Sequence, residues 1–185
     1  MTRKSRPAQP GIAASDDVEA MIRVDHAGEY GAVRIYEGQL AVLDARKGST
    51  KMAATIRKMA EQEQHHLKTF DALVNERRVR PTALEPVWRV AGFALGAATA
   101  LMGEKAAMAC TAAVEDVIDR HYAKQVARLD HDPQLKATVE EFRAEEIAHK
   151  EEALAQGAED APGYRLLSET IKAGCRLAIA LSERI

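Results

Sequence analysis

The sequence predicts an all-α protein built as a bundle of four helices, and three observations support this class. Only six of its 185 residues are proline, and aromatic residues make up 4% of the chain. Apolar side chains recur at every third or fourth position over long stretches, and a Glu-x-x-His motif occurs in each half of the chain. This recurrence places apolar side chains on one helical face, and a chain of this length can bury a core as one domain.

The first two helices are predicted from their apolar stripes. The first is expected to begin at Ser15, a residue type that caps helix N-termini, and to end near Lys47 and Gly48. Its stripe contains Ile22, Glu29, Val33, Tyr36, Leu40 and Leu43. The stripe of the second contains Ile56, Met59, Ala60, Glu63, His66, Leu67, Phe70, Leu73 and Val74. This helix must end before Pro81, because the residue preceding a proline is displaced from helical geometry.

The third and fourth helices follow from the same spacing. The third stripe contains Met108, Ala112, Glu115, Ile118, Tyr122, Val126 and Leu129. The fourth contains Leu135, Val139, Phe142, Glu146, His149 and Ala153. Asp132 and Pro133 predict a capped start for the fourth helix, and Gly157 predicts its stop.

Two further segments are apolar enough to form additional helices. The crossover between the helix pairs is uncharged from Val90 to Gly103, about 14 residues, which is shorter than the roughly 20 that span a bilayer. It is expected to lie against a membrane or the core, and its Gly92 and Gly96 give only weak evidence for helix pairing. The C-terminal segment pairs apolar residues with Lys172, Arg176 and Arg184 as an amphipathic interfacial helix would. Its apolar residues are Leu166, Leu167, Ile171, Cys175, Ala178 and Ile179. Packing of both segments on the bundle is the alternative.

Composition limits the remaining classes. The net charge of −2, from 26 basic and 28 acidic residues, gives no field that favours nucleic acid. Cys110 and Cys175 form no CxxC motif, which favours free thiols in a reducing compartment. Residues 1–14 are basic and proline-rich without an apolar signal region, so they are expected to form a disordered tail before a single domain at 15–185.

The two Glu-x-x-His motifs offer alternative pairings, which the helical faces decide. Glu61 and His65 share a face with charged residues, and Glu145 shares one with Thr138, Glu141 and Glu152. The inward pairs are therefore Glu63 with His66, and Glu146 with His149. Glu29 and Glu115 add one inward carboxylate from each of the other two helices.

Four carboxylates on buried stripes require compensation, because an unpaired buried ion costs several kcal/mol. A single Glu-x-x-His motif more often lies on the protein surface and has no function. Arginines could also compensate the charge of the carboxylates, but few basic residues share these stripes. Two divalent metal ions would balance four carboxylates. Carboxylates with one imidazole per ion favour iron or manganese over structural zinc. One Glu from each of two helices and Glu-x-x-His from the other two is the arrangement of ferritin-like di-iron bundles, whose chemistry is oxygen activation followed by oxidation or hydroxylation.

At the level of whole segments the chain closely resembles a known family. The segments DHAGEYGAVRIYEGQ, EQEQHHLKTF, RVRPTALEPVWRVAGFALGAATALMG, ACTAAVED, FRAEEIAHKEEAL and AGCRLAIALSERI are similar to the demethoxyubiquinone hydroxylases of ubiquinone biosynthesis, over residues 18–185. The resemblance implies a ferritin-like di-iron monooxygenase that uses O2 to hydroxylate the ring of demethoxyubiquinol (2-polyprenyl-3-methyl-6-methoxy-1,4-benzoquinol). It also implies a peripheral protein, expected at the cytoplasmic face of a bacterial cell membrane.

The resemblance carries over a ligand set for two iron ions, which are ferrous in the reduced state. These ligands are Glu29, Glu63, His66, Glu115, Glu146 and His149. Glu63 and Glu146 are implied as bridges, with Glu29 and His66 on one iron and Glu115 and His149 on the other. Tyr36 and Tyr122 each lie seven residues after a ligand, as outer-shell or channel groups or as plain core. A ferritin-type ferroxidase and a non-enzymatic helical scaffold are the rival interpretations. The tail length, the electron donor, the oligomeric state and a lipid-binding partner or biosynthetic complex stay open.

Overall fold

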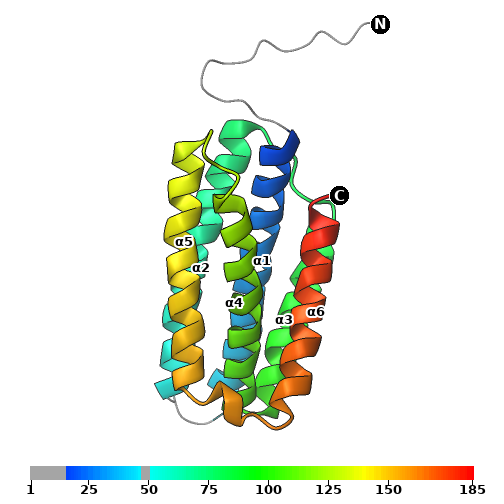
Figure 1. Cartoon of the computed structure of the whole chain (residues 1–185). Helices are drawn as coiled ribbons and strands as arrows, with labels where there is room; N and C mark the ends of the chain where they lie inside the picture. The colour runs from blue at the N-terminus through cyan, green and yellow to red at the C-terminus, as the bar shows by residue number, and fades with distance from the viewer. Residues whose placement is uncertain (1–15, 47–50) are drawn as a thin grey trace, which may run out of the picture.

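The computed structural model describes residues 16–46 and 51–185, and the elements in these ranges are helical (Figure 1). They are α1 (Asp16–Ala45), α2 (Lys51–Arg77), α3 (Glu85–Met102), α4 (Glu104–Val126), α5 (Pro133–Ala155), the 3-10 helix η1 (Ala158–Asp160) and α6 (Tyr164–Ser182). The predicted all-α, ferritin-like class is confirmed. The expected crossover helix is α3, and the expected C-terminal helix is α6.

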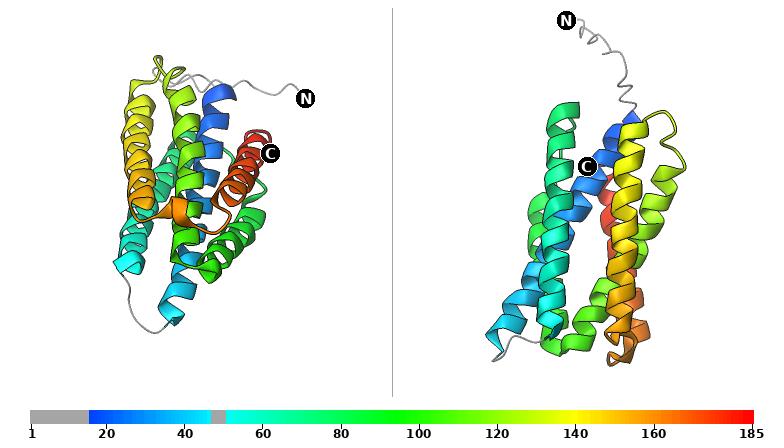
Figure 2. Two further views of the ribbon diagram at one scale, coloured as in Figure 1. Left: turned by 60° about the horizontal axis from the view of Figure 1, so that its bottom comes forward. Right: turned by 90° about the vertical axis from the view of Figure 1, so that its left-hand side faces the viewer.

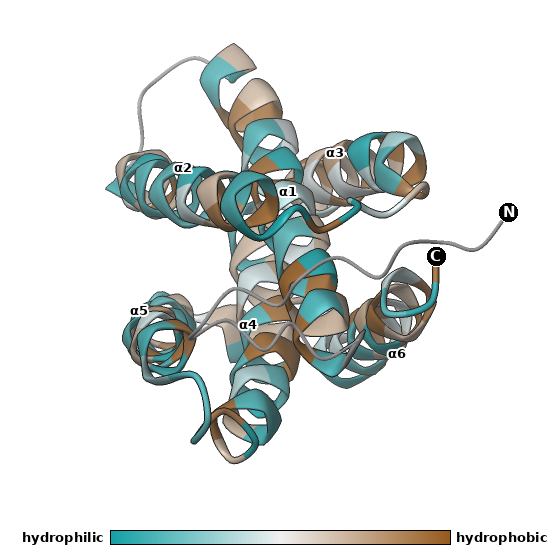
Figure 3. Ribbon diagram, turned by 90° about the horizontal axis from the view of Figure 1, so that it is seen from above, coloured by the Kyte–Doolittle hydropathy of each residue, from teal (hydrophilic) through white to brown (hydrophobic). Residues whose placement is uncertain are grey.

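The α-helices of the described residues form two layers, seen end-on in Figure 3 and from one side in the right-hand view of Figure 2. One layer holds α2, α1 and α3, and the other holds α5, α4 and α6. In one layer α3 packs against α1, and in the other α6 packs against α4. The chain therefore repeats one three-helix arrangement, and the four helices that carry the Glu and Glu-x-x-His positions enclose one interior.

Helix ends agree with most of the sequence signals. The Asp132 side chain accepts a hydrogen bond from the Leu135 amide at 3.2 Å, and Gly157 adopts a left-handed φ of 85° after α5 ends. The helix predicted from the third stripe is α4, and it ends at Val126, before Leu129, the last residue of that stripe. Leu129 is buried in the tight turn that follows, where its side chain completes the core. The expected tail at 1–14, the Ser15 cap and the end near residues 47–48 lie outside the described residues.

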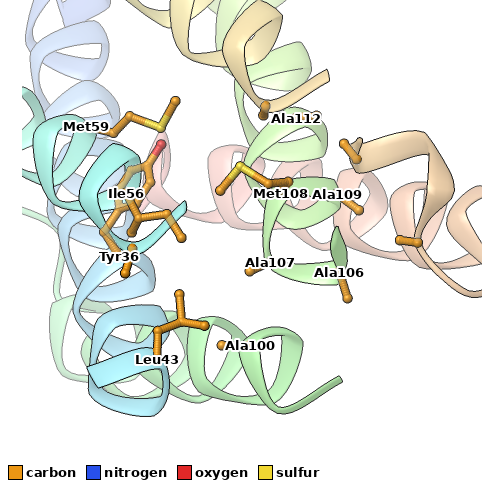
Figure 4. Packing of buried hydrophobic residues seen from close by; sticks show 14 residues of the cluster. Tyr36, Leu43, Ile56, Met59, Ala100, Ala106, Ala107, Met108, Ala109 and Ala112 are labelled. Atoms are coloured by element: carbon orange, nitrogen blue, oxygen red, sulfur yellow. The ribbon is translucent and has the colours of Figure 1, made fainter. Parts of the chain in front are cut away.

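The helix α4 is the central element and is buried on all sides over residues 106–117. Small side chains allow neighbours to approach it closely; they include Ala106, Ala107, Ala109, Ala112 and Ala113. Figure 4 shows Tyr36, Ile56 and Met59 facing Met108 across one apolar cluster. A second apolar cluster includes Ile22, Phe70, Tyr122 and Phe142. Along each of the four site-bearing helices, the inward polar residues lie between members of these two clusters.

The crossover helix α3 approaches α1 through glycines. A Cβ atom at Gly96 would overlap the Ile35 carbonyl, and one at Gly92 would lie 2.9 Å from the Gly31 carbonyl oxygen. The GxxxG spacing therefore serves packing within this chain, where the backbones of α1 and α3 meet. Among the described residues no helix combines the length and the apolarity that crossing a bilayer requires.

Candidate metal centre

Six polar side chains converge inside the four-helix part of the structure. They come from α1 (Glu29), α2 (Glu63 and His66), α4 (Glu115) and α5 (Glu146 and His149), and each is at most 3% exposed. The three-residue step inside each Glu-x-x-His motif brings its carboxylate and imidazole onto the same side of the helix. The structure thus brings together all six positions that the sequence predicts as ligands.

The six residues fall into two overlapping groups. One group is Glu29, Glu63, His66 and Glu146, and the other is Glu63, Glu115, Glu146 and His149. Within each group, one ligand atom from every residue lies within 4.8 Å of the others. Glu63 and Glu146 belong to both groups. The geometry could therefore hold two metal ions that share two carboxylates.

The atoms that face the middle of this cluster make no well-formed hydrogen bond within the described part of the chain and contact only one another, with His66 Nδ1 3.1 Å from Glu146 Oε1 and His149 Nδ1 3.1 Å from Glu63 Oε1. They include Nδ1 of both imidazoles and at least one oxygen of each of the four carboxylates. Buried polar atoms are normally hydrogen-bonded, and each unpaired one costs about 1–3 kcal/mol. Oxygen and imidazole nitrogen donors suit iron or manganese. The donor set thus fits two hard or borderline divalent ions.

Burial and mutual repulsion control the charges of the cluster. Burial, reinforced by the charge of Glu146, raises the pKa of Glu63 and of Glu115 well above the usual range. Burial opposes charge on the imidazoles, but the facing carboxylates raise the pKa of His66 to about 12 and that of His149 to about 9. Burial alone would raise the pKa of Glu146, yet the two imidazoles bring it to about 2. Without metal the cluster holds protons, which bound cations would displace.

Two tyrosines brace the cluster across the helix layers. The Tyr36 hydroxyl on α1 donates to Glu115 Oε1 at 2.9 Å, and the Tyr122 hydroxyl on α4 donates to Glu29 Oε1. Each tyrosine thus binds a carboxylate of the opposite layer, and each lies seven residues, about two helical turns, after the glutamate on its own helix. Both side chains are also part of the apolar clusters, so the roles of core packing and support of the site coincide.

The structure adds two residues that the helical pattern did not select. Glu145 was assigned to a solvated face, but its Oε2 lies 2.6 Å from His66 Nε2. Gln62 Oε1 lies 3.1 Å from His149 Nε2. Both contacts cross between α2 and α5, which one helix's periodicity cannot reveal. They orient the imidazoles so that Nδ1 faces the cluster.

Comparison with known proteins gives the family. The model of the family described as ubiquinone biosynthesis protein COQ7 matches residues 16–182 of the chain. The chain belongs to the COQ7 family. It is 54% identical over 180 residues to a protein of Rhodospirillum rubrum named 3-demethoxyubiquinol 3-hydroxylase, covering 97% of this chain and 82% of the relative.

Eukaryotic members of the COQ7 family are similar over most of their length as well. A human protein named NADPH-dependent 3-demethoxyubiquinone 3-hydroxylase, mitochondrial, is 52% identical over 173 residues, covering 91% of this chain and 78% of the relative. A Saccharomyces cerevisiae protein named 5-demethoxyubiquinone hydroxylase, mitochondrial, is 40% identical over 184 residues, covering 91% and 78%. The family assignment agrees with the resemblance seen in the sequence segments.

Proposed function

We propose that this chain hydroxylates the benzoquinol ring of demethoxyubiquinol with O2, as a di-iron monooxygenase of ubiquinone biosynthesis. The observation that carries the proposal is the pair of overlapping carboxylate and imidazole groups, whose buried inward atoms make no well-formed hydrogen bonds. The names of relatives that match most of this chain supply the substrate class, since three of them are called demethoxyubiquinol or demethoxyubiquinone hydroxylases.

Iron is the metal that this donor set would hold for such chemistry. Glu63 and Glu146 belong to both groups and would bridge the ions, with Glu29 and His66 completing one position and Glu115 and His149 the other. Two ferrous ions bound there would supply the activation of dioxygen. Four carboxylates balance the charge of two divalent ions, so the loaded centre would be close to neutral in its apolar surroundings.

The protein's own part is to position ligands and to keep water from entering through the ends of the bundle. Apolar clusters lie at both ends of the centre and limit solvent entry along the bundle axis. Tyr36 and Tyr122 hold Glu115 and Glu29 by hydrogen bonds. These contacts leave the second oxygen of each carboxylate, Glu115 Oε2 and Glu29 Oε2, free of hydrogen bonds and available to a metal ion. We propose both tyrosines as positioning residues of the centre.

A lipid surface is proposed as the environment from which the substrate enters. The exposed large hydrophobic side chains of the described residues all lie on α3, on α6 or at the C-terminus; they are Val87, Val90, Phe93, Leu101, Met102, Leu166, Leu177 and Ile185. The two helices lie on the same side of the molecule (Figures 1 and 3), where Trp88 Nε1 donates to Ser182 Oγ at 3.0 Å. A face this apolar, with Arg89, Arg165 and Arg176 exposed on the same helices, suits a membrane surface and a polyprenyl tail.

The test is incorporation of labelled oxygen. Iron-loaded, reduced protein is mixed with a short-tailed demethoxyubiquinone analogue, NADPH and ¹⁸O₂. The mass of the quinone product is then measured by mass spectrometry. We expect one labelled oxygen on the ring, and its loss in Glu146→Gln. Iron oxidation with an unchanged quinone would instead establish a ferroxidase, and failure to bind iron would leave the scaffold interpretation.

A further inference from the structure

The two imidazoles of the proposed centre differ in the group that holds their outer nitrogen. His66 Nε2 lies 2.6 Å from a carboxylate oxygen of Glu145, whereas His149 Nε2 lies 3.1 Å from the amide oxygen of Gln62. With Nδ1 directed to the metal positions, Nε2 carries the proton in both contacts. A carboxylate acceptor withdraws that proton more strongly than an amide and makes Nδ1 a stronger donor to a metal ion. The His66 position therefore has the stronger imidazole ligand.

The two imidazoles also differ in solvent access, and His66, which has the stronger acceptor, is the less accessible. His66 is fully buried, and its ring stacks on Phe142 with a centroid distance of 4.0 Å. His149 is 3% exposed and lines a cleft of about 640 Å³ between α2 and α5. Alanines at 54, 144 and 148 also line this cleft, and their methyl groups leave its volume open. The imidazole of one metal position thus lines the cleft directly, while the other imidazole is covered by an aromatic ring and meets the cleft only through Glu145; the inward Nδ1 atoms of both are buried.

The cleft is chemically suited to the passage of a hydrated cation. Oxygen donors on its walls come from Gln62, Glu145 and Glu152 and can replace waters of a divalent ion. Lys51 and Lys58 also line it, and their charges offset those of the two glutamates. The cleft walls should therefore neither repel a divalent cation strongly nor bind it tightly. The cleft opens between α2 and α5, away from the apolar residues of α3 and α6, so ions and a lipid-like ring would use different faces.

We infer that the two metal positions are inequivalent. The position of Glu29 and His66 retains its ion, whereas the position of Glu115 and His149 exchanges its ion with solution through the cleft between α2 and α5. This inference rests on the proposed di-metal centre, and it adds which of the two ions is labile and the route by which it leaves.

Release of ferrous iron to a chelator tests the inference without any turnover. Protein loaded anaerobically with Fe(II) is mixed with an excess of a colour-forming chelator, and absorbance is followed in time. We expect two ions per chain and two release phases of equal amplitude. Gln62→Glu should slow the fast phase and Glu145→Gln should speed the slow phase, each by about ten-fold, the lower end of the range for outer-shell partners. Because Glu145 also lines the cleft, its variant is expected to have a smaller effect on the fast phase than on the slow phase.

Further variants separate access from ligand strength. Ala148→Leu, which fills part of the cleft at an exposed position, should slow the fast phase alone. Gln62→Ala should speed the fast phase. This variant replaces Gln62→Glu in the test if the added carboxylate perturbs folding. Glu141→Gln is the matched control, because Glu141 is exposed on α5 outside the cleft, and it should change neither phase.

The possible failures are distinguishable. Two bound ions that leave in a single phase, or a Gln62 variant that alters the slow phase, would overturn the inequivalence and leave the di-metal centre intact. Binding of fewer than two ions per chain would overturn the di-metal centre itself, and the inference with it.

Discussion

Tyr36 on α1 donates a 2.9 Å hydrogen bond to Glu115 on α4, and this contact joins the two helix layers at the candidate metal centre. Tyr122 on α4 makes the reciprocal contact with Glu29 on α1. Because each tyrosine supports a carboxylate from the other half of the chain, the two halves cannot shift against each other without disturbing both metal positions.

Removal of the Tyr36 hydroxyl should weaken the fold. Tyr36→Phe leaves a buried oxygen of Glu115 unpaired, which we expect to lower the free energy of unfolding of the metal-free protein by about 1–3 kcal/mol. Chemical denaturation followed by circular dichroism measures this loss. Tyr30→Phe is the control on the same helix, because Tyr30 is half-buried. Equal effects of the two variants would contradict the bracing role.

Glu63→Gln should separate stability from metal binding. Burial and the charge of Glu146 both disfavour a charged Glu63, so its replacement by a neutral isostere should leave the metal-free protein as stable as wild type or more stable. Wild type should gain stability from Fe(II), by about 2.7 kcal/mol for each occupied position at a hundred-fold excess over its dissociation constant, and the variant should gain much less. Thermal unfolding with and without anaerobic Fe(II) measures both quantities. A metal-free variant that melts well below metal-free wild type would show that Glu63 is needed for folding.

The close approach of α1 and α3 depends on Gly96. Gly96→Ala places a methyl group against the Ile35 carbonyl, so the helices must separate at a cost of about 1–3 kcal/mol. Gly174→Ala is the control in another helix, because nothing lies within 4 Å of the added carbon. It should stabilise the protein by up to about 1 kcal/mol through helix propensity. Denaturant midpoints of the two variants should therefore move in opposite directions.

Asp132 should give the stability a defined pH dependence. It binds Arg77 and caps α5, and the ion pair with Arg77 lowers its pKa. Because the folded-state pKa is depressed, this stabilisation is fully present above the unfolded value of about 4 and is lost as pH falls through the lower folded pKa. Asp132→Ala should cost about 1–2 kcal/mol at pH 7, through loss of both the cap and the contact with Arg77, and progressively less at acid pH. A cost that stayed constant below pH 3 would argue against the ionised form as the source.

Binding to lipid vesicles tests the apolar face. Val90→Glu, at a side chain that is 69% exposed on α3, should reduce co-sedimentation with vesicles severalfold, because a charge then replaces an apolar contact. Ala72→Glu adds the same charge at an exposed position on α2 and should leave binding unchanged. If both variants bound like wild type, the contact with lipid would have to be sought elsewhere.

The sequence by itself determined the helices and the inward direction of the six polar residues. Periodicity sufficed for this, because the residues that share a buried stripe are fixed by the local geometry of one helix. The periodicity placed Glu63 and His66 between Met59 and Phe70 on the buried stripe. The glycine at position 157 predicted the end of α5. The end of the third helix was the exception, since Leu129 continues the apolar pattern after the helix itself has ended.

The tertiary structure decided every relationship between helices. It paired Tyr36 with Glu115, brought Glu145 from an outward face to His66, and seated Gly96 on Ile35. It also gave the two imidazoles different partners and left a cleft beside one of them. None of this is encoded in the period of a single helix, because the crossing of helices and the reach of side chains across them depend on packing of the whole core.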